Sequence, residues 1–77
     1  MTDVPFPVMS QKEPDAVGVV ATWYVAEGEQ VVADQLLAEV QLDKVDVEVP
    51  APCAGTVHLT TGEGTEVAQG TIIATID

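Results

Sequence analysis

The sequence contains no arginine and only two lysines, Lys12 and Lys44, against thirteen aspartate and glutamate residues in a chain of 77. The formal charge of −11 repels phosphate backbones and anionic lipid surfaces, which argues against nucleic-acid and membrane binding. Without arginine, the chain also lacks the bidentate donor that commonly grips carboxylates and phosphates. Each of its two lysines is therefore conspicuous.

Cysteine and histidine occur once each, as Cys53 and His58. A single cysteine excludes an internal disulfide framework, and these two residues alone cannot complete a structural zinc site. Residues 1–8 lack the basic and then apolar pattern of a secretory signal, and no stretch approaches the ~20 apolar residues of a membrane span. We therefore expect a soluble protein in a reducing compartment, the cytoplasm or, in a eukaryote, the mitochondrial matrix.

Long uninterrupted helices are also excluded, because five prolines and six glycines punctuate the chain. Between them lie short apolar runs rich in β-forming residues, at 17–25, 36–42, 45–49, 56–59 and 71–76. A chain of this length buries only about 60% of its unfolded surface, which leaves little room for an internal active site. The sequence predicts a single all-β domain over residues 1–77, either a barrel or a sandwich.

The two halves of the sequence resemble each other. At an offset of 36 residues, Gly28, Val31, Leu36, Leu37, Ala38 and Val40 match Gly64, Val67, Ile72, Ile73, Ala74 and Ile76. Upstream, Gly18 and Val20 match Gly55 and Val57 at an offset of 37. Neither half has enough strands to bury its apolar face alone, so we expect two quasi-equivalent sheets packed on each other.

A hairpin with Asp43 and Lys44 as a two-residue turn joins the halves. It sorts apolar residues onto one face and polar residues onto the other, as in a half-buried antiparallel pair. The apolar pairs are Leu42 with Val45, Val40 with Val47, and Ala38 with Val49, and the polar pairs are Gln41 with Asp46 and Glu39 with Glu48. Shifting the turn by one residue on one strand destroys this sorting.

Asp-Lys is a poor sequence for a tight hairpin turn, where Asn-Gly or Asp-Gly meets the need for positive φ at lower cost. The ordinary interpretation of Lys44 is a solvated charge on an exposed turn. Its rarity, its place at the midpoint of the repeat and its projection from a rigid hairpin favour a second interpretation. In that interpretation the amine is a point of covalent attachment.

Residues 41–57, which read QLDKVDVEVPAPCAGTV, resemble the attachment segment of the lipoyl domain family. Residues 18–31 resemble the second strand and glycine turn of that family, and residues 64–76 resemble its closing strands. The likeness thus covers nearly the whole chain. It implies a flattened barrel, or barrel-sandwich hybrid, of two four-stranded antiparallel sheets related by a pseudo-twofold axis.

The resemblance also implies which residues matter. Lys44 is the residue whose ε-amine is joined to lipoic acid in an amide, and Asp43 and Val45 complete the recognised tripeptide. Gln41 and Leu42 stand where the family commonly has Glu-Thr, next to the surface that a partner would touch. We therefore include both as candidate recognition residues.

The implied function is that of a non-catalytic carrier, as in the acyltransferase component of a 2-oxo acid dehydrogenase complex. A lipoyl group on a flexible lysine stem moves acyl groups and reducing equivalents between active sites. The implied partners are a lipoate ligase or lipoyl transferase, a 2-oxo acid decarboxylase or dehydrogenase component, and dihydrolipoamide dehydrogenase. We expect the isolated domain to be a monomer.

Two rival functions remain open. The related biotinyl domains of carboxylases usually carry Met-Lys-Met, so Asp43-Lys44-Val45 favours lipoate, and the chain has no extra loop to form the protruding thumb of some biotinyl domains. The other rival is an unmodified interaction module in which Lys44 is a plain surface residue. Asp34 stands where the family commonly has glycine, and we expect the fold to accommodate it because aspartate tolerates left-handed geometry.

We assign no catalytic residue and no metal site. Cys53 and His58 could form a nucleophile and base, but no third orienting group lies nearby in the sequence. We expect Cys53 to pack beside Pro52, and His58 to lie on the polar side of a strand. Trp23 is expected to pack at the core or its rim, and the acidic residues near turns are expected to be solvated.

Overall fold

A computed structural model describes residues 1–77 and contains eight strands and no helix. The strands are β1 (Thr2–Pro5), β2 (Val17–Trp23), β3 (Gln30–Val31), β4 (Leu36–Leu42), β5 (Val45–Pro50), β6 (Gly55–Leu59), β7 (Glu66–Ala68) and β8 (Ile72–Ile76). The structure has no helix with the length and apolar character needed to cross a membrane. The prediction of an all-β fold is confirmed.

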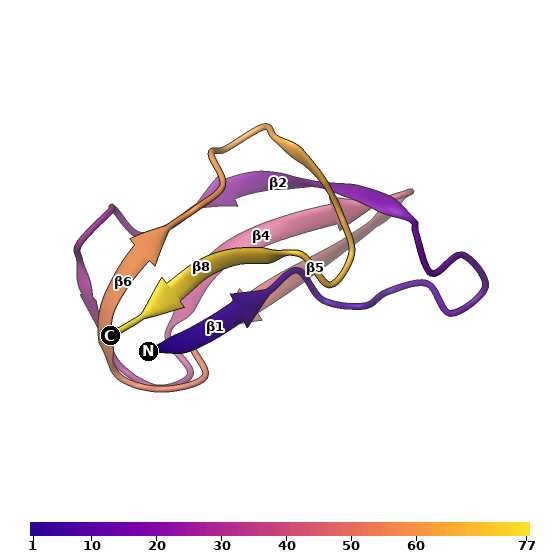
Figure 1. The fold of residues 1–77 in the computed structure, drawn as a ribbon. Helices are drawn as coiled ribbons and strands as arrows, with labels where there is room; N and C mark the ends of the chain where they lie inside the picture. Colours follow the sequence, from indigo (N-terminus) through magenta and orange to yellow (C-terminus); the bar gives the residue numbers. More distant parts are fainter.

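The strands form two four-stranded antiparallel sheets, with the orders β1-β8-β6-β3 and β5-β4-β2-β7 (Figure 1). The register carries the pseudo-twofold symmetry that the repeat predicted. Gly18 faces Val67 between β2 and β7, and the repeat counterparts of these residues, Gly55 and Val31, face each other between β6 and β3. Each half of the sequence therefore contributes equivalent strands to both sheets.

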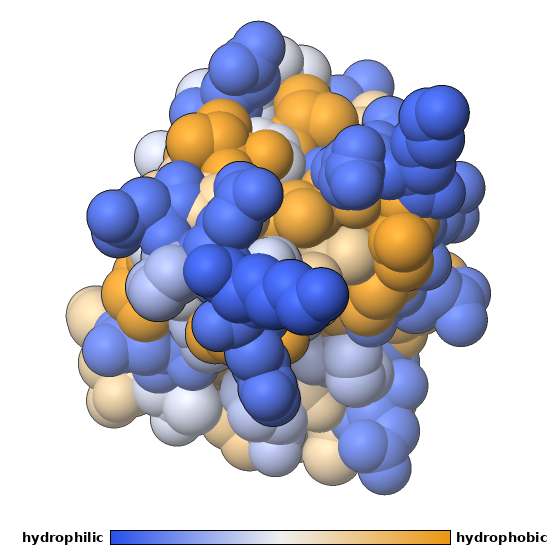
Figure 2. All heavy atoms as spheres, turned by 90° about the vertical axis from the view of Figure 1, so that its right-hand side faces the viewer, coloured by the Kyte–Doolittle hydropathy of each residue, from blue (hydrophilic) through white to orange (hydrophobic).

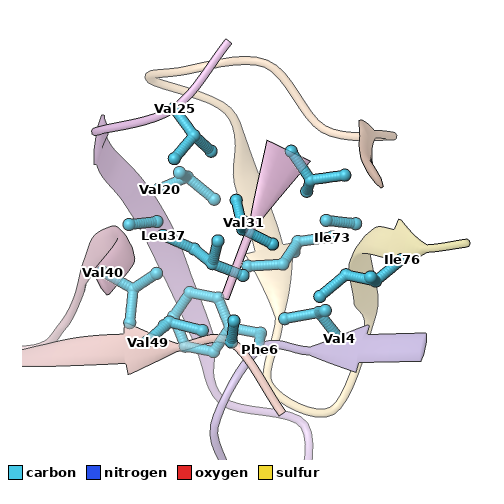
Figure 3. Packing of buried hydrophobic residues seen from close by; sticks show 14 of the residues in the cluster. Val4, Phe6, Val20, Val25, Val31, Leu37, Val40, Val49, Ile73 and Ile76 are labelled. Atoms are coloured by element: carbon cyan, nitrogen blue, oxygen red, sulfur yellow. The ribbon is translucent and has the colours of Figure 1, made fainter. Parts of the chain in front are cut away.

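The core lies between the two sheets and consists of 15 buried hydrophobic residues. Figure 3 shows side chains from both halves of the chain meeting there, with Leu37 and Ile73, which match each other in the repeat, near its centre. Both are fully buried, and Phe6 closes the space beside them with an exposed fraction of 0%. Trp23 is half-buried and packs against this cluster as expected, and its indole Nε1 donates a 2.9 Å hydrogen bond to the Thr61 carbonyl.

Three strands, β1, β3 and β7, have no counterpart among the apolar runs read from the sequence, although the family resemblance implied eight strands. All three are edge strands of two to four residues. Edge strands are short because a long unpaired edge invites aggregation, and so few residues give no readable alternation.

Asp34 adopts the left-handed conformation that we expected, with φ of 68°, and its repeat counterpart Gly70 has φ of 84°. Its backbone N–H donates to the Ala51 carbonyl at 2.8 Å. The turn therefore forms as in the second half of the chain, without glycine.

The two chain ends lie side by side, because β1 pairs with β8 and Thr2 faces Ile76. Figure 1 places both ends at one end of the molecule and the β4–β5 hairpin tip at the other. The molecule is elongated, measuring 34 × 19 × 18 Å along its principal axes.

Candidate functional site

The β4–β5 hairpin has the register predicted from the sequence. Leu42 faces Val45 at the tip, and the pairing continues through Val40 with Val47 and through Glu39 with Glu48. Such an antiparallel pair is held by backbone hydrogen bonds and by side-chain packing on its buried face. It gives the turn a rigid base.

The turn at the tip consists of Asp43 and Lys44. Asp43 has φ of 59°, whereas Lys44 has no positive φ, so the signs of φ match a type II′ turn rather than type I′. Glycine usually occupies the first central position of that turn, and aspartate tolerates it better than most residues. The turn thus accepts a mildly unfavourable residue immediately before the lysine.

The Lys44 side chain is exposed and free of partners. Both ion pairs of the protein belong to His58, so no carboxylate lies within 4.0 Å of the Lys44 amine, although Asp43 and Asp46 are close in sequence. The amine is available for chemistry from solvent. A rigid base with one free amine is the geometry that tethering requires.

Burial along the apolar face of the hairpin declines toward its tip. On β5, Val49 is 4% exposed, Val47 is half-buried and Val45 is 56% exposed. The apolar face predicted for the hairpin is therefore buried at Val49 but exposed at Val45. Val45 is thus an uncovered apolar side chain next to Lys44.

Gln41 and Leu42 take different positions. Leu42 is only 8% exposed and belongs to the core cluster, whereas Gln41 is exposed on the opposite face of β4 between Val19 and Asp46. Both lie next to the turn, as predicted. Gln41 alone offers its whole side chain to a partner.

Two shallow grooves flank the turn, and Asp43 lines both of them. The larger has a volume of about 490 Å³ and is lined by Met9, Ser10, Glu13, Ala16, Val17, Leu42, Asp43 and Val45. The smaller has a volume of about 270 Å³ and is lined by Val17, Gly18, Val19, Gln41, Asp43, Gly64 and Glu66. Figure 2, which views the molecule from the side of the hairpin tip, shows hydrophobic atoms gathered beside protruding hydrophilic ones.

Gln69 is a residue of this region that the sequence did not reveal. It is the one buried polar side chain of the protein, and its amide holds residues 9–14 next to the larger groove. Its bonding partners are 55 to 60 residues away in sequence, so no local pattern marks it. The one available signal is a break in the repeat, because Gln69 corresponds to Ala33 in the first half.

His58 and Cys53 do not form a catalytic pair. The two ring nitrogens of His58 both face carboxylates, with Nδ1 at 2.7 Å from Glu27 Oε2 and Nε2 at 3.2 Å from Asp77 Oδ2. Cys53 is half-buried and packs against the core. Neither ring nitrogen is left to accept a proton from a thiol.

The Glu27 carboxylate controls the protonation of His58. Its hydrogen bond to the imidazole raises the pKa of His58 above the ordinary value of 6.5, and desolvation offsets part of this effect. In turn, the hydrogen bond from His58 and a 2.6 Å hydrogen bond from the Leu59 N–H lower the pKa of Glu27. This cluster ties the loop before β3 to β6 and to the chain end.

Comparison with known proteins gives concordant results. A sequence profile of the family described as "Biotin-requiring enzyme" matches residues 2–76. The succinyltransferase component of a 2-oxoglutarate dehydrogenase complex from Rickettsia conorii is 39% identical over 71 residues, which cover 91% of this chain and 18% of that protein. The acetyltransferase component of a pyruvate dehydrogenase complex from Staphylococcus aureus is 43% identical over 61 residues, covering 78% of this chain and 14% of that protein.

Among solved structures, the lipoyl domain of the 2-oxoglutarate dehydrogenase complex from Azotobacter vinelandii superposes with a TM-score of 0.79 and 31% sequence identity. The match covers 100% of this chain and 96% of that domain. The chain therefore corresponds to a small part of its curated relatives and to nearly the whole of an isolated lipoyl domain. The two four-stranded sheets, their pseudo-twofold symmetry and the hairpin register also match what the sequence led us to expect. The chain therefore belongs to the biotinyl/lipoyl attachment family and is a lipoyl domain.

Proposed function

We propose that Lys44 is the residue that carries covalently bound lipoic acid, and that the chain is a carrier with no catalytic activity of its own. The observation that supports this most is the free, exposed amine of Lys44 on a rigid hairpin tip, at the end of the molecule opposite the chain ends. A chain tethered through its ends can present this tip to another enzyme. When bound, the lipoyl group supplies a dithiolane that takes up an acyl group and is later reoxidised.

The residues around Lys44 fit an attached group. The amine has no ion pair to break, and the groove beside it presents Leu42 and Val45 to an aliphatic chain. Amide formation removes one of the two lysine charges and changes the formal charge from −11 to −12. Asp43 and Asp46, neither of which forms an ion pair, then flank an uncharged side chain.

The setting that we propose is the acyltransferase component of a 2-oxo acid dehydrogenase complex, which is what the curated relatives are named for. The partners in that setting are a lipoate ligase or lipoyl transferase, the 2-oxo acid decarboxylase component and dihydrolipoamide dehydrogenase. We propose the cytoplasm, or the matrix of a mitochondrion, as the compartment. Asp43 and Val45, with Gln41 and Leu42 behind them, are the proposed recognition residues.

Acyl transfer tests this function directly. The lipoylated chain is incubated with a 2-oxo acid decarboxylase component and either pyruvate or 2-oxoglutarate, and its intact mass is followed. We expect the mass to rise by one acyl group with the cognate acid, and no change in the Lys44→Arg chain. If the lipoylated chain gained no acyl group with either acid, the carrier function would be wrong.

A further inference from the structure

Lysine amines are scarce in this protein, and neither of the two is paired. Lys12 and Lys44 are both exposed, and both ion pairs of the protein belong to His58 instead. The proposed attachment of lipoic acid accounts for Lys44. Lys12 has no role in that proposal, and its amine is also open to solvent.

Lys12 lies at the same end of the molecule as Lys44. It belongs to the connection between β1 and β2, residues 6–16, which projects at the end where the β4–β5 hairpin tip lies (Figure 1). The larger groove is bordered by residues close in sequence to each lysine. These residues are Ser10, Glu13, Asp43 and Val45. The two lysines therefore start from the margins of one shallow groove.

The backbone on both sides of Lys12 is held in place by the buried amide of Gln69. Its Oε1 accepts a hydrogen bond from the Ser10 N–H at 2.9 Å, and its Nε2 donates to the Ser10 carbonyl at 2.6 Å and the Glu13 carbonyl at 3.1 Å. Connecting segments on a protein surface are usually mobile. Lys12 instead projects from a backbone that is fixed at the hairpin end.

A lipoyl arm on Lys44 is long enough to meet the Lys12 amine. At about 1.2 Å per bond, the extended arm spans roughly 15 Å from the Lys44 Cα atom to its sulfur atoms, and the Lys12 side chain adds about 6 Å. Perpendicular to its long axis, the molecule measures only 19 × 18 Å. Two residues at the same end of the molecule are therefore within the combined reach of these side chains.

An acyl group on the arm is held as a thioester, which donates acyl groups to amines. In its unprotonated form, the Lys12 amine attacks the thioester carbonyl carbon. The C–N bond forms, the C–S bond breaks and the dihydrolipoyl thiolate leaves. The amine nitrogen loses a proton to water and the thiolate gains one, so the products are an amide on Lys12 and a free thiol. The step needs neither an oxidant nor a reductant.

We propose that Lys12 accepts the acyl group from the lipoyl arm of the same chain and is therefore a site of self-acylation. This inference rests on the proposed function of Lys44 and adds a reaction that competes with delivery of the acyl group. Tethering favours it, because groups joined by a short flexible linker meet at an effective concentration in the mM range. Separate chains at about 10 μM meet far less often.

Acylation of Lys12 removes the second lysine charge of the chain. Lipoylation of Lys44 changes the formal charge from −11 to −12, and the amide on Lys12 changes it to −13. Delivery of acyl groups to an acceptor clears the thioester and leaves the amide in place. A chain whose acyl group is not collected is thus marked by an uncharged Lys12.

The test follows an acetyl group that survives hydroxylamine, which cleaves thioesters and leaves amides. The lipoylated chain is reduced, loaded by exchange with a small acetyl thioester, desalted and incubated at neutral pH. We expect intact mass to show one stable acetyl group on a growing fraction of the native chain, and peptide mapping to place it on Lys12. The first-order rate constant should not change when the chain is diluted about tenfold, because the transfer occurs within one chain.

The matched control combines Lys12→Arg with Val32→Lys, which keeps the number of lysines and moves one to the far end of the molecule. Val32 is 64% exposed, and its neighbour Val31 faces Gly55, which lies against the chain end. We expect at least about tenfold less stable acetyl in this variant, since a tether that cannot span two sites gives an effective concentration near zero. Lys12→Arg alone should keep its thioester and gain no stable acetyl group.

The outcomes separate this inference from the proposed function. No stable acetyl group on the native chain, or as much on the variant with Val32→Lys, would overturn the inference. A rate constant that falls in proportion to dilution would assign the transfer to collisions between chains and also count against it. A native chain that accepts no lipoyl group would instead contradict the proposed function of Lys44.

Discussion

Gly18 illustrates how a single residue supports the β4–β5 hairpin. It lies in β2, where a Cβ atom would overlap the Phe6 ring and come within 2.7 Å of the Gln41 carbonyl oxygen. Phe6 is fully buried in the core, and Gln41 is next to the turn residues on β4. The absence of a side chain at Gly18 thus allows the core and the hairpin to approach each other.

We therefore expect Gly18→Ala to lower the free energy of unfolding by about 1–3 kcal/mol, the usual cost of overpacking. Denaturant titration followed by Trp23 fluorescence measures it. Gly62→Ala is the matched control, because the atom nearest its added Cβ is 3.7 Å away, at the Thr65 hydroxyl. Equal stability of both variants would contradict the close packing at Gly18.

The pair formed by His58 and Glu27 makes stability depend on pH at two limits. The folded pKa of His58 is raised above 6.5, so the contribution of His58 is complete below pH 6.5 and is lost as pH rises through the folded pKa. The folded pKa of Glu27 is lowered from 4.5, so its contribution is complete above pH 4.5 and is lost as pH falls through the folded pKa. The pair stabilises the fold most between these two values.

NMR titration of the single imidazole checks this account. We expect a His58 midpoint above 6.5 in the native chain and a lower midpoint in Glu27→Gln, which removes the carboxylate. An unshifted His58 midpoint in the native chain would contradict the contact. Lipoylation of Lys44 should be unaffected, since His58 lies toward the chain ends.

At the scale of elements, the hairpin contains a like-charge pair. Glu39 on β4 and Glu48 on β5 face each other directly, and neither has a cationic partner. Opposed like charges destabilise a sheet, and opposite charges at the same positions stabilise it. The β4–β5 hairpin is therefore less stable than its backbone pairing alone would make it.

Replacing Glu48 by lysine should raise the free energy of unfolding by up to about 1 kcal/mol, because Glu39 then faces a cation. The matched control is Glu66→Lys, which makes the same change of charge on edge strand β7, opposite the apolar Val19. If Glu48→Lys raised the free energy of unfolding no more than Glu66→Lys does, the effect would come from the change in net charge alone. Thermal unfolding at low salt is the measurement.

The central strands, the edge strand β5 and the hairpin register were predictable from the sequence, and the short edge strands β1, β3 and β7 were not. Alternation along β4 and β5 sets which residues face each other, and turn residues bound the apolar runs that became β2, β6 and β8. The two-residue β3 carries no periodic signal, since its place depends on pairing with β6. Neither the exposure of Val45 nor the contact between Gln69 and residues 9–14 could be predicted, because both depend on where distant elements lie.

For the whole molecule, charge is the dominant surface property. A formal charge of −11 on 77 residues makes the overall field of the protein negative, and lipoylation of Lys44 would add one negative unit to it. Such a field accelerates association with basic surfaces and is screened by salt over about 8 Å at physiological ionic strength. We expect partner enzymes to approach the tip through basic surfaces.

Stopped-flow measurement of association between the lipoylated chain and a 2-oxo acid decarboxylase component tests this steering. The association rate should fall at least about tenfold when ionic strength rises from near 0.01 M to near 0.2 M, while the dissociation rate changes little. An association rate insensitive to salt would show that the acidic surface serves solubility rather than approach.

The central claim is that Lys44 is the single attachment residue and that its group is lipoyl. The most direct test is intact-mass spectrometry of the native and Lys44→Arg chains after incubation with a lipoate ligase and, separately, with a biotin ligase. We predict one lipoyl increment on the native chain, none on Lys44→Arg although Lys12 remains, and no biotinyl increment on either. A biotinyl increment at Lys44, a lipoyl increment that survives in Lys44→Arg, or no increment on the native chain would contradict the account.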